Sequence, residues 1–200
     1  MRVFLSVLIL IFSLQSLTKA DDISEFEIEG MSIGDSLLDH FSKKEIKQNL
    51  MLDYYRNLPK NFRNIYLISE FKKLKRFKTY TNVSIDFFKK DKKFIIQTIS
   101  GLLFIKNQKE CYKKQNQIDE ELSQLFKNTS RQTNTNNHSF DKTGNSKTRA
   151  INYWFDNGDL ITLICTDWSD EITNSYGWTD NLALEIKTKE FNNFLGEAYN

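Results

Sequence analysis

The sequence predicts an α+β fold in which a mostly antiparallel sheet of about six strands carries helices packed on one face. Two observations predict it. Segments with apolar residues at helical spacing alternate with segments in which apolar and polar residues take turns. The resulting order is helix, helix, three strands, long helix, three strands, helix, which suggests two repeats of a helix plus three strands. With 40% hydrophobic and 27% charged residues among 200, the composition is that of an ordinary globular protein.

The first 20 residues have the features of a secretory signal peptide. Arg2 supplies a positive charge, residues 3–14 are almost wholly apolar, and Thr18 and Ala20 are the small residues expected before a cleavage site. The apolar run is short for a membrane-spanning helix, although retention as an anchor is the alternative. No cysteine follows it for lipid attachment. We therefore expect an exported protein, periplasmic or extracellular, with one α+β domain over residues 21–200 and subunits at 21–105 and 106–200.

The charge balance argues against nucleic acid as a partner. The whole chain has 28 basic and 26 acidic residues, and both Arg2 and Lys19 belong to the signal segment. The exported chain is therefore formally neutral, whereas a general nucleic-acid binder needs a basic surplus.

Two capping boxes predict the first helices. Ser32 and Asp35 have the spacing of a box that begins a helix reaching Phe41, and Ser42 and Glu45 begin a second helix that reaches about Tyr55. Three strands are expected next, at 65–71, 80–88 and 94–105, because these segments are rich in β-branched and aromatic residues.

The second half begins with the longest predicted helix. Asn107 caps it, and an apolar stripe that includes Cys111, Ile118 and Leu122 runs to about Phe126. Residues 127–148 hold almost no large apolar group, so we expect a flexible polar loop there.

Three further strands and a helix are predicted after this loop. The segments 150–155 and 160–168 read as a hairpin whose Asn157-Gly158 turn suits type I′. A last strand covers 182–186, and Thr188 caps a short terminal helix.

Cys111 and Cys165 are the two cysteines of the sequence and give its most specific structural prediction. In an exported protein two cysteines favour one disulfide, here between the long helix and an interior strand. The alternative is two buried free thiols. A redox role is not expected, because the two are far apart in sequence rather than in a C-x-x-C motif.

Aromatic and acidic residues concentrate between positions 153 and 180. Rings flanked by carboxylates could stack on a sugar or anchor a protein partner, whereas the alternative is that the rings close the core and the acids form turns. The candidate binding surface consists of Trp154, Asp156, Asp159, Trp168, Asp170, Tyr176, Trp178 and Asp180.

No catalytic or cofactor-binding motif is recognisable. His40 and His138 have no partner at metal-ligand spacing, and nucleophile-elbow, phosphate-loop and dinucleotide patterns are absent from the sequence. We expect no cofactor, no metal and no enzymatic activity.

The run from Ile28 to Phe41, followed by Ser42 to Ile46, resembles the start of an uncharacterised family of small exported proteins from AT-rich marine alphaproteobacteria. Glu110-Cys111-Tyr112 and the segment 154–159 fit the same resemblance, which implies a periplasmic or secreted location. Gly30-Met31-Ser32 before two helices and three strands is more distantly similar to the small lipoprotein of the outer-membrane β-barrel assembly machine. Doubling of that unit resembles the β-lactamase-inhibitor protein, whose concave sheet grips a partner enzyme.

These observations together predict a non-enzymatic exported protein that binds a macromolecular partner in the cell envelope. The alternative is a module that binds a glycan or another small ligand through the aromatic and acidic residues of 153–180.

Overall fold

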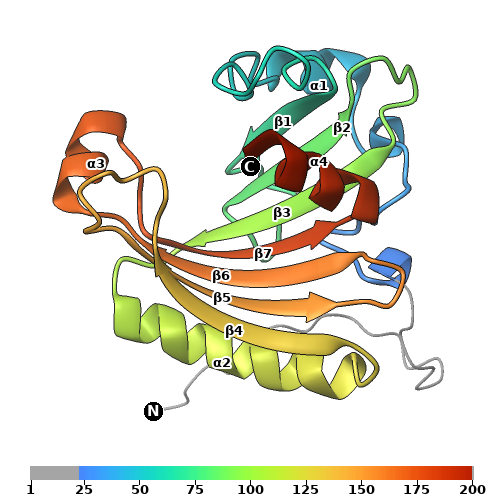
Figure 1. Cartoon of the computed structure of the whole chain (residues 1–200). Coiled ribbons are helices and arrows are strands. Elements are labelled where there is room, and N and C mark those ends of the chain that lie inside the picture. Colours follow the sequence, from blue (N-terminus) through green and yellow to red (C-terminus); the bar gives the residue numbers. More distant parts are fainter. Residues whose placement is uncertain (1–22, 200) are drawn as a thin grey trace.

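The computed structural model describes residues 23–199, and their strands form one antiparallel sheet (Figure 1). The predicted signal segment lies outside the described residues. The strands are β1 (Tyr66–Lys72), β2 (Asn82–Phe88), β3 (Ile96–Phe104), β4 (Ser130–Asn137), β5 (Lys147–Trp154), β6 (Leu160–Asp167) and β7 (Asn181–Lys187). The helices are α1 (Lys43–Gln48), α2 (Gln108–Leu125), α3 (Asp170–Tyr176) and α4 (Lys189–Tyr199), with 3-10 turns at Ile23–Glu25 and Leu37–Asp39. The α+β class is therefore confirmed, with seven strands in this part of the chain rather than about six.

The strand order is β1-β2-β3-β7-β6-β5-β4. Each half of the sheet is a helix followed by a three-stranded meander that runs from an edge toward the centre, β1 to β3 after α1 and β4 to β6 after α2. The strand β7 lies between the two meanders and pairs with both β3 and β6.

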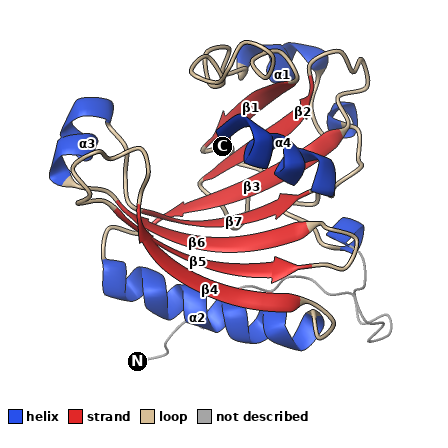
Figure 2. Cartoon of the chain, in the orientation of Figure 1, coloured by secondary structure: helices blue, strands red, loops and turns tan. Residues whose placement is uncertain are grey.

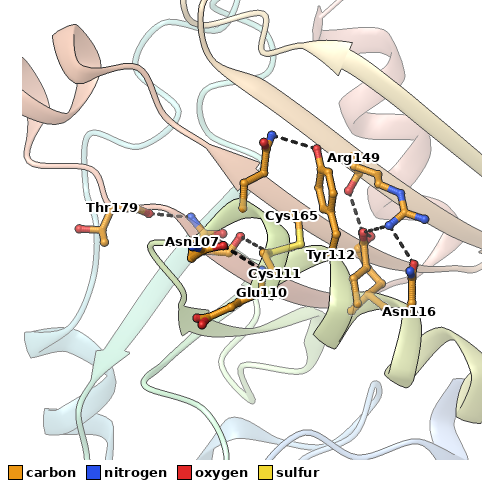
Figure 3. Close-up of a disulfide and its surroundings, with 12 residues drawn as sticks. Asn107, Glu110, Cys111, Tyr112, Asn116, Arg149, Cys165 and Thr179 are labelled. Carbon is orange, nitrogen blue, oxygen red and sulfur yellow. Dashed lines mark hydrogen bonds between the residues drawn. A yellow bond between two sulfur atoms is a disulfide. The ribbon is translucent and has the colours of Figure 1, made fainter.

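Helix α2 covers one face of the sheet (Figure 2). It buries Cys111, Gln115, Ile118 and Leu122, and it lies against β6 and β7. The disulfide between Cys111 and Cys165 fastens it to β6 (Figure 3). The predicted pairing of the two cysteines is therefore present. The main hydrophobic core fills this face, with Ile99, Ile161, Leu163, Leu184 and Ile186 among its fully or almost fully buried members.

Helix α4 lies on the opposite face, which differs from the prediction that the helices share one face. Its Phe191 and Phe194 pack against Tyr66 of β1, and Tyr55 completes a second, smaller core there. The physical reason is that β1 and β2 carry large apolar side chains on both faces, so that each face of this half requires a cover.

The helix predicted from Ser32 is absent, and only the 3-10 turn Leu37–Asp39 forms. The backbone groups of this segment pair instead with residues just before and within β3: Gly34 donates to Ile96, and Ile96 donates to Asp35. Half of the predicted capping box is present, because Ser32 N–H donates to the Asp35 carboxylate at 2.8 Å. Backbone pairing with the start of β3 thus prevents the helix, although the capping residues of a helix start are present.

The second predicted helix begins where expected but is shorter. Both hydrogen bonds of the Ser42–Glu45 capping box are present. The helix ends at Gln48 because the next residues pair with the outer edge of β1: Glu70 N–H donates to Asn49, and Met51 N–H donates to Ile68. The chain then passes around this edge to the face that α4 covers.

The prediction of a flexible loop over 127–148 is wrong, because β4 occupies Ser130–Asn137. All eight residues of β4 are exposed, and they pair with β5 without a register shift. An edge strand with both faces in water has no apolar alternation for a sequence pattern to detect.

The predicted hairpin between β5 and β6 is present, with a different turn. Gly158 has a φ of 92°, whereas Asn157 does not have the positive φ that type I′ requires. Gly158 N–H donates to Phe155, and Phe155 N–H donates to Asp159. This is a three-residue turn of type I closed by a left-handed glycine.

Candidate functional site

Five aromatic side chains meet at the end of the sheet where β6 and β4 terminate, beside α3. They are His138 and Phe140 from the segment after β4, Trp168 after β6, Tyr176 of α3 and Trp178 after it. We call this set the aromatic cluster. Ring centroids lie 4.3 Å apart for His138–Trp168, 4.7 Å for Trp168–Trp178 and 4.5 Å for Phe140–Trp178. Tyr176 lies 5.1 Å from Phe140 and 5.5 Å from Trp178.

The outer rings of the cluster remain in contact with water. Tyr176 is 57% exposed, Phe140 39% and Trp178 36%, whereas His138 and Trp168 are half-buried beneath them. Burial lowers the pKa of His138 by more than the nearby Asp141 raises it. The neutral imidazole is therefore favoured, and its Nδ1 accepts the Phe140 N–H at 3.2 Å.

Asp141 immobilises the loop that carries His138 and Phe140. One carboxylate oxygen accepts hydrogen bonds from the Thr143 N–H and hydroxyl, at 2.9 and 2.6 Å. The other accepts from the Ser146 N–H and hydroxyl, at 2.8 and 2.6 Å, and from the Ser169 hydroxyl at 2.9 Å. These bonds favour the charged form and hold the pKa of Asp141 well below its usual range.

Ser169 links this loop to α3, which positions Tyr176 and Trp178. It is the N-cap of α3, and its own N–H donates to the Ser146 hydroxyl at 2.9 Å. At the other end Gly177 adopts the left-handed conformation that terminates a helix, with φ 68°. The loop, α3 and the residues after it are thus one hydrogen-bonded unit.

Carboxylates lie beside the cluster. Asp180 accepts the Trp168 N–H at 2.8 Å, and burial together with Asp180 raises the pKa of Asp167 above its usual value. Asp170 and Glu171 occupy the exposed first turn of α3. Acidic side chains therefore outnumber the two lysines of the adjoining loop, Lys142 and Lys147.

The predicted binding surface divides into two groups at opposite ends of β6. Trp168, Asp170, Tyr176, Trp178 and Asp180 lie at the α3 end. Trp154, Asp156 and Asp159 lie at or beside the β5–β6 turn, and an eight-residue strand separates the groups by roughly 23 Å.

In the second group, Asp159 has a structural role. Asp159 accepts the backbone N–H of Lys189 at 2.8 Å and so ties the β5–β6 turn to the start of α4. Trp154 is 37% exposed.

His138 and Phe140 were not among the residues predicted for the binding surface. Both follow β4, in the segment predicted to be a flexible loop. Their signal was the Asp141-Lys142-Thr143-Gly144 sequence, whose aspartate and glycine are typical of a fixed turn.

The face opposite α2 carries both polar and apolar rows where α4 does not cover it, and the row Leu102–Ala183–Ile164–Ala150 is apolar. One row of paired residues runs across the strands from β1 to β4 and contains only polar side chains. In strand order it consists of Glu70, Ser84, Ser100, Glu185, Thr162, Asn152 and Gln132. The hydroxyls of Thr98 and Thr162 on this face are buried, with no hydrogen-bond partner among the described residues.

A buried carboxyl group, Asp86, lies on the same face under α4. It accepts the Tyr55 hydroxyl at 2.5 Å. Burial raises the pKa of Asp86 to about 7, against the lowering effect of the Tyr55 hydrogen bond. Glu185 and Lys187, an ion pair with 2.5 Å between the charged atoms, act on the pKa of Asp86 in opposite directions, Glu185 raising it and Lys187 lowering it.

Over residues 23–199 the side chains form no group of three potential metal ligands. No helix within that range has the length and apolarity needed to cross a bilayer. Comparisons with family models, with curated proteins and with solved structures found no match.

Proposed function

We propose that this chain is an exported, non-enzymatic binding protein that docks a protein of the cell envelope on the aromatic cluster. The bound segment carries an apolar or aromatic anchor flanked by basic side chains. The Cys111–Cys165 disulfide supports a location in an oxidising compartment outside the cytoplasm.

The observation that carries this proposal is a set of exposed rings on an immobilised support. Large exposed rings leave apolar area in water, and burying such area on binding is favourable by about 25 cal/mol per Å². The rings lose little freedom when a partner arrives, because the Asp141 hydrogen bonds and the mutual ring contacts already fix them. Preorganisation of this kind lowers the entropic cost of association.

The shape and charge of the cluster favour a protein segment over a sugar. Adjacent rings are inclined by 39° to 81°, so they form angular recesses rather than one flat stacking platform. Asp167, Asp170, Glu171 and Asp180 lie at this end of the sheet and outnumber Lys142 and Lys147 of the adjoining loop, so the net charge is negative and complementary to lysine or arginine in the partner.

A second candidate function is glycan binding on the open face of the sheet. Trp154 projects its exposed ring on the same face as the polar row that includes Asn152, Thr162 and Glu185. A single exposed ring beside hydroxyl, amide and carboxylate groups is suited to stacking and hydrogen bonding with a sugar.

A peptide library tests the first candidate against the second. A phage-displayed random dodecapeptide library would be panned on the purified protein, and enriched peptides would be synthesised and titrated by tryptophan fluorescence. We expect sequences that join an aromatic or aliphatic residue to Lys or Arg. Affinity should fall about 30-fold in Tyr176→Ser, as for a residue that carries much of the binding energy.

Trp154→Ser is the control, because it removes a ring that is also exposed, at 37%, but lies at the opposite end of β6. Peptide affinity should be unchanged in this variant. If enriched peptides bind Tyr176→Ser as well as the original protein, the aromatic cluster is not the docking site. If instead an immobilised glycan array gives binding that Trp154→Ser abolishes, the second candidate replaces the first.

A further inference from the structure

Strand β4 forms an edge of the sheet that lacks the protections usual for edge strands. Protected edges are short, bulged or interrupted by lysine or proline. In β4 eight residues pair regularly with β5, and the only charged residue is Arg131, whose guanidinium is held by Asp119 of α2 at 2.6 Å. No described segment pairs with its outer side.

The hydrogen-bond phase of β4 follows from the turn that leads to β5. His138 N–H donates to Ser146, and the pairing continues without a shift through Asn136–Thr148 and Asn134–Ala150. In an antiparallel pair alternate residues bond to one neighbour, so the even-numbered residues of β4 bond to β5. The N–H and C=O groups of Arg131, Thr133, Thr135 and Asn137 therefore point away from the sheet.

We propose that a second copy of this chain pairs with this edge, antiparallel, through its own β4. One two-fold register uses all four outward residues, and it has Asn134 on the symmetry axis. Arg131 then lies opposite Asn137 of the second copy, and Thr133 lies opposite Thr135. Each such pair exchanges two backbone hydrogen bonds, about eight in all.

The side chains are compatible with this register on both faces. On the α2 side Arg131 meets an asparagine amide and the two threonines meet each other. On the other side Gln132 meets Asn136, and Asn134 meets its own copy. No like charges lie opposite one another, and amide and hydroxyl groups can hydrogen-bond across the strands. The self-complementary sequence, rather than an exposed edge alone, favours a second copy as the occupant.

Cysteine cross-linking tests the register directly. Two Asn134 residues would form a pair without backbone hydrogen bonds, whose Cα atoms are about 4.5 Å apart, within the range that a disulfide spans. We expect Asn134→Cys to give a covalent dimer under mild oxidation. Asn136→Cys is the matched control on the same face, because it lies opposite Gln132 and about 13 Å along the strand from its own copy. Its yield of dimer should be at least about tenfold lower.

Charge pairing gives a second test that does not depend on oxidation. Asn134→Lys and Asn134→Asp each place like charges on the axis, so each variant alone should sediment as a monomer. An equimolar mixture should recover the dimer, because the two charges are then opposite. Circular dichroism of each variant checks that the fold is intact.

Two outcomes would overturn the proposal. The first is an unmodified protein that remains monomeric at millimolar concentration in sedimentation experiments. The second is equal cross-linking at positions 134 and 136. Neither outcome affects the peptide titration at the aromatic cluster, so the two proposals stand or fall separately.

Discussion

The two halves of the sheet differ in which of their faces and edges are covered. The half formed by β1, β2 and β3 is covered on both faces, and the residues after α1 pair with its outer edge. The half formed by β4, β5 and β6 has α2 on one face, an open face with polar and apolar rows, and a free edge. The first half therefore uses both of its faces and its outer edge for structural contacts, whereas the second half leaves one face and one edge available for binding.

The largest predicted effect concerns the disulfide, which fastens α2 to the half of the sheet that has a helix on only one face. Replacement of Cys111 and Cys165 together by serine removes a covalent link between residues 54 positions apart. We expect a loss of about 4 kcal/mol in the free energy of unfolding from the entropy of the unfolded chain. Urea denaturation of the double variant measures it.

A loss below about 1 kcal/mol would mean that noncovalent contacts alone hold α2 on the sheet. The hydrogen bonds from the Gln115 amide to the Arg149 and Leu163 carbonyls, both 2.8 Å, are the contacts that would then be responsible.

The next prediction concerns Asp86, in the half covered on both faces. Its folded-state pKa of about 7 lies above the ordinary value of 3.8. The unfolded chain therefore loses its proton first, and stability should fall as the pH rises from about 4 to about 7. Asp86→Asn removes this penalty, so we expect a gain of about 1–3 kcal/mol at pH 8 and almost no change at pH 4.

Denaturation curves of the original protein and of Asp86→Asn at pH 4, 6 and 8 test this expectation. Tyr55→Phe is the companion variant, because it removes the hydroxyl that donates to Asp86. It should destabilise at pH 8, where the carboxylate is charged. Equal pH dependence in all three proteins would show that Asp86 is ionised normally in the fold.

The smallest global effect is expected for Asp141→Asn, at the aromatic cluster. Because the pKa of Asp141 is depressed in the fold, its hydrogen bonds contribute their full stabilisation above the ordinary carboxyl pKa, and this contribution declines as the pH falls from about 4 toward the depressed pKa. The variant should lose amide-exchange protection at Thr143 and Ser146 at pH 7, with little change elsewhere. Unchanged protection would mean that ring packing alone orders the loop.

Local sequence patterns correctly predicted those elements whose tertiary contacts favour the same structure as the local pattern. Asn107 caps α2 by accepting the Glu110 N–H at 3.1 Å, and the Cys111–Ile118–Leu122 stripe is the buried one. Thr188 caps α4 through the Phe191 N–H at 3.2 Å, as expected. The class of the fold and the cysteine pair followed from such patterns.

The remaining elements depend on contacts that a sequence pattern does not contain. The threonines and asparagines of β4 form a strand because β5 offers a regular edge, and α3 has one buried residue, Ile172. The cluster was only partly foreseen for the same reason. His138 lies against Trp168 because Asp141 holds the loop that carries His138 to Ser169, the residue after Trp168.

The position of β7 in the chain has a consequence for how the protein is completed during synthesis. The strand at the centre of the sheet follows the other six described strands in sequence, and its neighbours β3 and β6 are not paired with each other. The two meanders form from local contacts, whereas their union waits for residues 181–187 and is expected to be the slow step. A chain shortened before Asn181 would present three free edges, those of β3, β6 and β4, instead of the edge of β4 alone, and should aggregate rather than fold.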